Sequence, residues 1–116
     1  MEHHAVYNLC KYLAQNGYHV TELGVDSQGI LNLNELSDAV REDTAIVSIM
    51  YANNETGVIF PIEEIGVIVK QKGSLLHTDA VQAVGKLPLN LAMSTIDLLT
   101  LSGHKLHAPK GIGALF

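Results

Sequence analysis

The sequence is poor in cysteine, tryptophan and basic residues, and these shortages exclude several classes of protein. One cysteine among 116 residues leaves no disulfide framework and no four-cysteine zinc site, and it suits a reducing compartment such as the cytoplasm. Seven basic residues against 12 acidic ones give a formal net charge of −5, which argues against a nucleic-acid partner. No apolar run approaches the roughly 20 residues that cross a bilayer, so we expect no membrane association.

Apolar residues are plentiful instead, at 47% of the chain. A chain of 116 residues is long enough for one compact domain. This composition fits either a core-rich α/β domain or a piece of a larger protein that covers its apolar faces. Because Phe116 falls inside an apolar run, we expect the second of these, a segment of a longer protein.

The spacing of the apolar residues predicts helices that alternate with strands. The predicted helices cover residues 4–16, 32–41 and 61–72, with a short helical turn over 81–85. The predicted strands cover residues 18–25, 45–51, 75–79, 98–102 and 113–116, with 45–51 buried on both faces. Asn32 and Glu35 have the spacing of a capping box. Such alternation predicts an α/β fold with a mostly parallel sheet and flanking helices.

Polar residues follow three of the predicted strands. In open α/β sheets, ligands bind beyond the carboxyl ends of the strands, so we expect these residues to share one crevice. They are Asn54, Asp79, Gln82, Ser102, His104 and Lys105.

Each of these residue types has an ordinary explanation beside a functional one. An aspartate after a strand commonly caps a helix, but Asp79 could also be a fixed carboxylate for a cationic ligand atom. Lys105 could be a solvated charge, or an amine that forms a Schiff base. Ser102 to His104 could bind an anion. His104 and His107 alone are too few ligands for a metal, and we expect no metal site. A lysine, a carboxylate and an anion-binding loop together match the needs of pyridoxal phosphate.

Four stretches resemble the Nif/Isc-type cysteine desulfurases, which are pyridoxal-phosphate enzymes of the class V aminotransferase family. The resemblance covers essentially the whole chain, and the stretches together are far more specific than any one alone. It implies that residues 1–116 are the central segment of a fold type I large domain. The matching stretches are residues 2–6, 47–57, 77–86 and 102–113.

The resemblance also implies a role for each polar residue toward the cofactor. Lys105 resembles the lysine that forms the Schiff base and moves protons at the substrate α-carbon. Asp79 resembles the partner of the ring nitrogen, and Gln82 the donor to the phenolic oxygen. His3 resembles the imidazole that stacks on the ring.

The remaining roles concern the phosphate and the substrate. Ser102 and His104 resemble phosphate ligands, and Asn54 resembles the loop asparagine near the phenolic oxygen and the substrate carboxylate. In the family, L-cysteine is converted to L-alanine while its sulfur passes to an enzyme persulfide and on to iron–sulfur cluster assembly. The resemblance therefore implies L-cysteine as substrate, a sulfur-acceptor scaffold as partner, and a homodimer.

The family's chains are longer, and their sulfur-accepting cysteine and substrate-binding arginine lie in parts that this sequence does not match. Cys10 does not occupy the place of that cysteine, so we expect no sulfur transfer by this chain alone. Two alternatives stay open: a selenocysteine lyase of the same family, and a non-catalytic sheet core that self-associates and holds no cofactor. A nucleotide-binding domain is less favoured, because the first strand is not followed by Gly-x-Gly-x-x-Gly.

Overall fold

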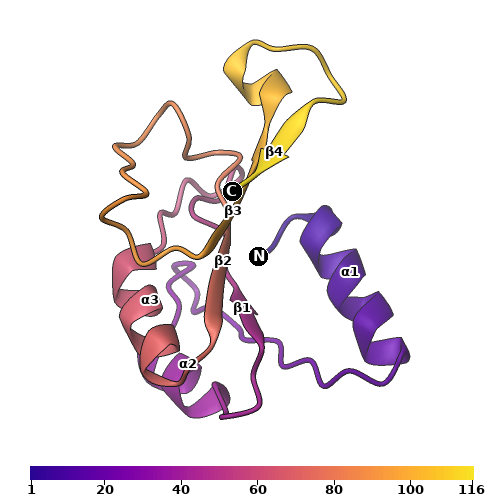
Figure 1. The fold of residues 1–116 in the computed structure, drawn as a ribbon, viewed down its shortest axis with the longest axis vertical. Coiled ribbons are helices and arrows are strands. Elements are labelled where there is room, and N and C mark those ends of the chain that lie inside the picture. Colours follow the sequence, from indigo (N-terminus) through magenta and orange to yellow (C-terminus); the bar gives the residue numbers. More distant parts are fainter.

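Four strands form a single sheet in the order β1-β2-β3-β4 in the computed structural model, which describes residues 1–116 (Figure 1). The strands are β1 (Ile46–Ser48), β2 (Leu75–Asp79), β3 (Leu98–Ser102) and β4 (Gly113–Leu115). The helices are α1 (His4–Gln15), α2 (Leu33–Ala39), α3 (Ile62–Gln71) and the short 3-10 helix η1 (Gly103–Leu106). None of the helices has the length and apolarity needed to span a bilayer.

The first three strands are parallel and the fourth is antiparallel, which confirms the predicted α/β fold with a mostly parallel sheet. Ser48 aligns with His77 between β1 and β2, and Asp79 aligns with Thr100 between β2 and β3. The carboxyl ends of these strands therefore meet at one edge of the sheet, as the crossover connections of parallel strands require.

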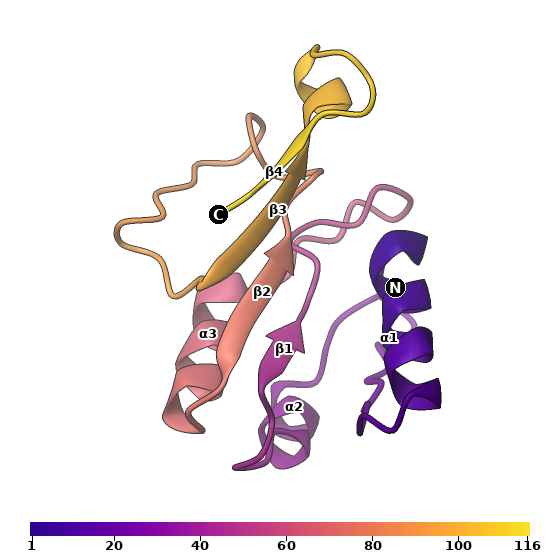
Figure 2. The same ribbon diagram turned by 45° about the vertical axis from the view of Figure 1, so that its right-hand side comes forward.

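The hydrophobic core lies between the sheet and the helices α2 and α3, which cover the same face (Figure 2). Helix α3 packs on β2 through Ile65 and Val69, which have no exposed surface. Leu76 and Leu99 meet them from β2 and β3, and Leu36 of α2 completes the layer. This packed face makes the strand ends rigid enough to hold side chains in place.

Helix α1 stands on the opposite side of the sheet, and none of its residues is buried (Figure 1). Its apolar spacing produced the helix over residues 4–15 as predicted, yet Leu9 and Tyr12 stay more than half exposed. On the same side, Ile46 and Leu75 of the sheet are about half exposed, at 52% and 46%. The two faces of the sheet are thus covered to very different extents.

Several predicted elements are wrong in type or length. Residues 18–25 are not a strand, because no neighbouring strand pairs with them, although Leu23 and Val25 pack against the core. By contrast, residues 81–85 form hydrogen-bonded turns in which the amide of Val84 donates to the carbonyl of Ala80, in agreement with the short helical turn predicted there. Helix α2 ends at Ala39, two residues before the predicted end, and β1 covers only the first part of 45–51.

The predicted burial of β1 and the predicted capping box also need correction. Ile46 is exposed, so β1 is not buried on both faces. Asn32 does cap α2, with its Oδ1 accepting hydrogen bonds from the amides of Asn34 and Glu35. Glu35 Oε1 accepts a hydrogen bond from the side-chain amide of Asn32 at 3.4 Å, whereas in a capping box it would accept one from the backbone amide of Asn32.

Candidate cofactor-binding site

Asp79 is the last residue of β2 and is 8% exposed. Its Oδ1 accepts a hydrogen bond from the amide of Val81 at 3.0 Å. One of its two oxygens therefore has the local structural role that the sequence allowed for. Neither of the two ion pairs in the structure involves Asp79. A nearly buried carboxylate without a cationic partner is costly, and a cationic ligand atom would offset that cost.

Gln82 and Asn54 line one open pocket of about 230 Å³ at the same edge of the sheet. Asn54 belongs to the loop after β1, and Gln82 to the turns after β2. The Oε1 of Gln82 accepts a hydrogen bond from Lys86 Nζ at 2.8 Å, which leaves the amide group of Gln82 free to donate. Lys86 was not singled out from the sequence, although it lies four residues after Gln82, as neighbours on a helical turn do.

Ser102, His104 and Lys105 lie at the carboxyl end of β3 and in η1. Ser102 Oγ and His104 Nδ1 are 2.7 Å apart and share a hydrogen bond. Lys105 is exposed, and neither ion pair of the structure involves it. The structure thus brings Ser102 and His104 into contact, but no hydrogen bond joins Lys105 to Asp79 or Gln82.

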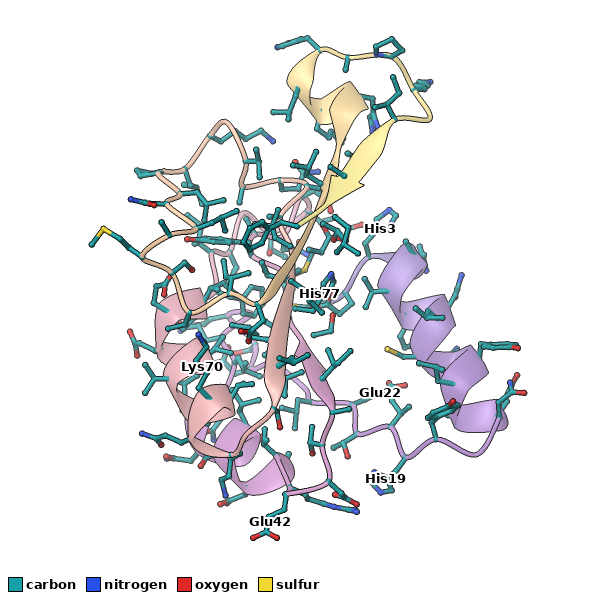
Figure 3. All side chains as sticks on the ribbon, viewed as in Figure 1. His3, His19, Glu22, Glu42, Lys70 and His77 are labelled. Carbon is teal, nitrogen blue, oxygen red and sulfur yellow. The ribbon has the colours of Figure 1, made fainter.

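His3 is the N-cap residue of α1, and its Nδ1 accepts a hydrogen bond from the amide of Ala5 at 3.2 Å. Because Nδ1 is an acceptor here, a neutral His3 ring carries its proton on Nε2. The imidazole is exposed where the chain enters α1, with its ring 6.3 Å from that of His4 (Figure 3). Its ring is therefore available for stacking on the side of the sheet that faces α1.

Glu2 and Asn53 attach this N-terminal segment to the sheet, and neither is among the site residues predicted from the sequence. Glu2 Oε1 accepts a hydrogen bond from the amide of Met50 at 2.7 Å, and Asn53 Nδ2 donates to the carbonyl of Met1 at 3.2 Å. Burial raises the pKa of the Glu2 carboxyl group above 4.5; the Met50 bond opposes this rise, and the charge of Asp79 adds to it. Glu2 and Asp79 are thus electrostatically coupled neighbours.

A row of three polar side chains crosses the sheet behind Asp79. His77 Nδ1 lies 2.8 Å from Ser48 Oγ on β1, and His77 Nε2 lies 3.3 Å from Thr100 Oγ1 on β3. His77 and Asp79 are two residues apart on one strand, so their side chains share a face of the sheet, on the side of α1 (Figure 3). Burial lowers the pKa of His77 below 6.5, with the charge of Asp79 acting in the opposite direction.

Cys10 is half-buried on α1, and burial raises the pKa of its thiol above 9.0. A thiol of raised pKa is a poor nucleophile near neutral pH, because only the thiolate attacks. This agrees with leaving Cys10 out of the site. No three histidine, cysteine, aspartate or glutamate side chains lie close enough together to hold a metal ion.

The side chains at this edge of the sheet fit pyridoxal phosphate. Asp79 offers a carboxylate without a cationic partner to a protonated ring nitrogen, and the hydrogen-bonded pair of Ser102 and His104 offers a donor to a phosphate. Gln82 offers a free amide, and Lys105 an amine that is not engaged in an ion pair. The pocket that Asn54 and Gln82 line does not include Asp79, Ser102, His104 or Lys105, so the structure does not show the single crevice predicted from the sequence.

Comparison with known proteins gives consistent results. The profile of the family Aminotransferase class-V matches residues 1–116. The chain is 66% identical to "Cysteine desulfurase 2" of Trichormus variabilis and 53% identical to "Cysteine desulfurase NifS" of Azotobacter vinelandii, in both cases over 116 residues. These alignments cover 100% of this chain and 29% of each relative. The chain thus spans less than a third of the length of these curated relatives.

Solved structures show the same similarity in three dimensions. A structure described as a NifS-like protein superposes with a TM-score of 0.94 at 47% sequence identity, covering 99% of this chain and 32% of that one. A structure described as SspA in complex with cysteine also gives a TM-score of 0.94, at 40% identity, covering 99% of this chain and 33% of that one.

Proposed function

Because the chain belongs to the class V aminotransferase family, we propose that it is the part of a cysteine desulfurase that holds pyridoxal phosphate. The names of the similar proteins support this activity, and the neighbour that was solved with cysteine supports L-cysteine as the substrate rather than selenocysteine. The observation that carries the cofactor proposal is Asp79, a nearly buried carboxylate with no cationic partner at the carboxyl end of a parallel strand.

Four residues would hold and orient the ring. Asp79 would keep the ring nitrogen protonated, since a nearby negative charge favours the charged form. Gln82 would donate its free amide to the phenolic oxygen. His3 would lie against one face of the ring, and Asn54, which lines the same pocket as Gln82, would fix the substrate carboxylate.

Three residues at the end of β3 would hold the remaining groups. Ser102 and His104 would hold the phosphate together: one donates to the other in the bond that joins them, and the second donates to the phosphate. Lys105 would hold the cofactor covalently through Nζ and, once released by the substrate, would carry protons to and from the substrate α-carbon. When bound, pyridoxal phosphate supplies an electron sink for the charge that develops at that carbon.

The whole protein would convert L-cysteine to L-alanine and pass the sulfur to a cysteine thiolate, and from there to a scaffold protein for iron–sulfur cluster assembly. We propose a homodimer in the cytoplasm as its working form, and a single cysteine outside any disulfide suits such a reducing compartment. The sulfur acceptor would be a cysteine of the whole protein other than Cys10, whose thiol pKa is raised by burial. This 116-residue chain should therefore release no alanine from cysteine by itself.

The test is a visible absorbance titration of the chain with pyridoxal phosphate. The expected result is a visible band that is absent in Lys105→Ala and that disappears when borohydride reduces the C=N bond, leaving the cofactor irreversibly attached to Lys105. Lys110→Ala is the matched control, because Lys110 is exposed in the loop between η1 and β4 and has no role in the proposal. A band of equal strength in Lys105→Ala would contradict the role of Lys105.

A second candidate is a self-associating sheet core that holds no cofactor. The observation in its favour is the exposed apolar surface of α1 and β4, with Leu9, Tyr12 and Leu115 each more than half exposed. This candidate predicts concentration-dependent oligomers and no cofactor band. Sedimentation velocity with and without pyridoxal phosphate separates the two.

A further inference from the structure

Helix α1, whose N-cap is the proposed site residue His3, is attached to the rest of the molecule by few polar contacts. Only two hydrogen bonds join residues 1–15 to any residue beyond 18, namely those made by Glu2 and by the carbonyl of Met1. No residue of α1 is buried, so packing does little to fix the helix against the sheet. The placement of His3 at its start therefore depends on the two residues that precede it.

The Glu2 contact satisfies an amide that nothing else in the molecule satisfies. The amides of Ile49 and Tyr51 donate to carbonyls of β2, at His77 and Asp79. Alternation along an extended chain turns the amide of Met50 away from β2. Met50 is 3% exposed, and Glu2 Oε1 accepts its amide at 2.7 Å. A buried backbone amide without a hydrogen-bond partner costs free energy, so the bond to Glu2 is stabilising.

The Asn53 contact adds a second fixed point. Asn53 is 8% exposed, and its Oδ1 accepts hydrogen bonds from the amides of Glu55 and Thr56, which holds its side chain in one orientation. Its Nδ2 then donates to the carbonyl of Met1. The chain is thus held at two consecutive residues directly before His3, and His3 in turn caps α1 through Nδ1.

We propose that Glu2 is a positioning residue, whose carboxyl group holds the Met50 amide and thereby fixes His3 beside the Asp79 site. The proposal rests on the proposed function only in taking the cofactor as the group that His3 meets. In this proposal Glu2 acts through the Met50 amide and not by contact with the cofactor. Its neighbours with charge are Asp79 from β2 and the N-terminal ammonium group.

The first test needs no cofactor and uses backbone ¹⁵N order parameters for residues 3–6 in the 116-residue chain. Glu2→Ala should lower these values from about 0.85 to below about 0.6, as expected for a freed segment. Glu2→Gln keeps an oxygen that can accept the Met50 amide, so it should behave as the wild type does. Glu42→Ala, which removes an exposed carboxylate remote from the site, is the charge-matched control and should change nothing (Figure 3).

The second test measures affinity for pyridoxal phosphate in Glu2→Ala, His3→Ala and the double variant. If Glu2 acts by keeping His3 in place, Glu2→Ala lowers the competent fraction, and a fall to about one-tenth weakens binding about tenfold. The double variant should then bind no more weakly than His3→Ala, and Glu2→Gln should restore the wild-type affinity.

Each outcome decides one of the two proposals. Unchanged order parameters in Glu2→Ala overturn the positioning role, and so does an additive loss of affinity in the double variant. If Glu2→Ala makes residues 3–6 mobile but leaves the affinity for pyridoxal phosphate unchanged, the positioning role is overturned as well. If the wild-type chain shows no cofactor band at all, the proposed function fails for this chain, while the order parameters still support or overturn the positioning role.

Discussion

At the scale of single residues, Asp79 combines a local structural role with a predicted cofactor role, and two substitutions separate them. Asp79→Asn keeps an Oδ1 that accepts the Val81 amide but removes the charge. It should leave the thermal midpoint close to that of the wild type while weakening pyridoxal-phosphate binding at least tenfold, since one pKa unit of charge stabilisation is worth about that factor. Asp79→Ala should in addition lower the unfolding free energy by about 1 kcal/mol, because the Val81 amide loses its hydrogen-bond acceptor.

Thermal melts and an absorbance titration on the same two variants check this prediction. Wild-type affinity in Asp79→Asn would show that the charge of Asp79 is not what the ligand needs. Equal melting temperatures for both variants would show that the Val81 bond contributes little.

His77 gives a prediction about pH. Burial holds its pKa below 6.5, so the unfolded chain binds a proton more readily than the folded chain does. Its contribution to stability is therefore present above pH 6.5 and is lost as the pH falls through the depressed folded pKa. Glu2 acts in the opposite sense, because its pKa is raised in the fold: its contribution is lost as the pH rises from 4.5 through the raised value.

Urea unfolding of the wild type and of His77→Gln, across about one pH unit on either side of 6.5, measures the His77 effect. The wild type should lose stability relative to His77→Gln as the pH falls. Glu2→Gln should keep the His77 slope, which shows that the slope does not come from the carboxyl group. Parallel curves for the wild type and His77→Gln would contradict the prediction.

At the scale of elements, the contact between α3 and the segment before β3 depends on Gly66. A Cβ at this position would overlap the Thr95 side chain and lie 3.2 Å from Leu76 Cδ2. Thr95 is held in place, because its amide donates to Glu63 Oε2 at 2.8 Å. Gly66→Ala should therefore destabilise the fold by about 2 kcal/mol, since overpacking outweighs the ~1 kcal/mol gain in helix propensity.

Denaturant unfolding measures this change, and Val67→Ala is the matched control. Val67 is the next residue of the same helix and is 51% exposed, so its replacement should change stability by less than about 0.5 kcal/mol. A Gly66→Ala chain as stable as the wild type would mean that the 90–97 segment moves aside at little cost.

The elements also show which structural features could be predicted from the sequence. Strands 75–79 and 98–102 were predicted with their observed bounds, because buried parallel strands have short apolar runs bounded by polar residues. Residues 18–25 alternate as a strand does, but alternation reports which side is buried and cannot report whether a partner strand is present.

The candidate site was predictable to the extent that it follows strand ends and family motifs. Asp79 and Ser102 end their strands as expected, and the comparisons confirm the family. Glu2 and Asn53 were not chosen, because their partners are backbone groups about 50 residues away in sequence. A carboxylate that accepts one distant backbone amide leaves no spacing pattern to recognise. The roles toward the cofactor stay predictions.

At the scale of the whole molecule, the two faces of the sheet should differ in local stability. Helix α3 has Ile65 and Val69 fully buried, whereas α1 has no buried residue. Amides of α1 should exchange with solvent by local opening at a free energy near zero, whereas those of α3 should require nearly global unfolding. Hydrogen exchange followed by NMR measures both helices in one sample, and comparable protection in α1 and α3 would contradict this prediction.

The hydrogen bond from Met50 to Glu2 also bears on aggregation. Strand β1 lies at an edge of the sheet, and edge strands with unpaired amides invite a strand from another molecule. Just past β1, the Glu2 carboxyl group occupies the amide that such a strand would use. A side chain cannot pass the hydrogen-bonding pattern on to a further strand, so the ladder stops there. The bond that holds the start of α1 thus also leaves this amide unavailable to a strand from another molecule.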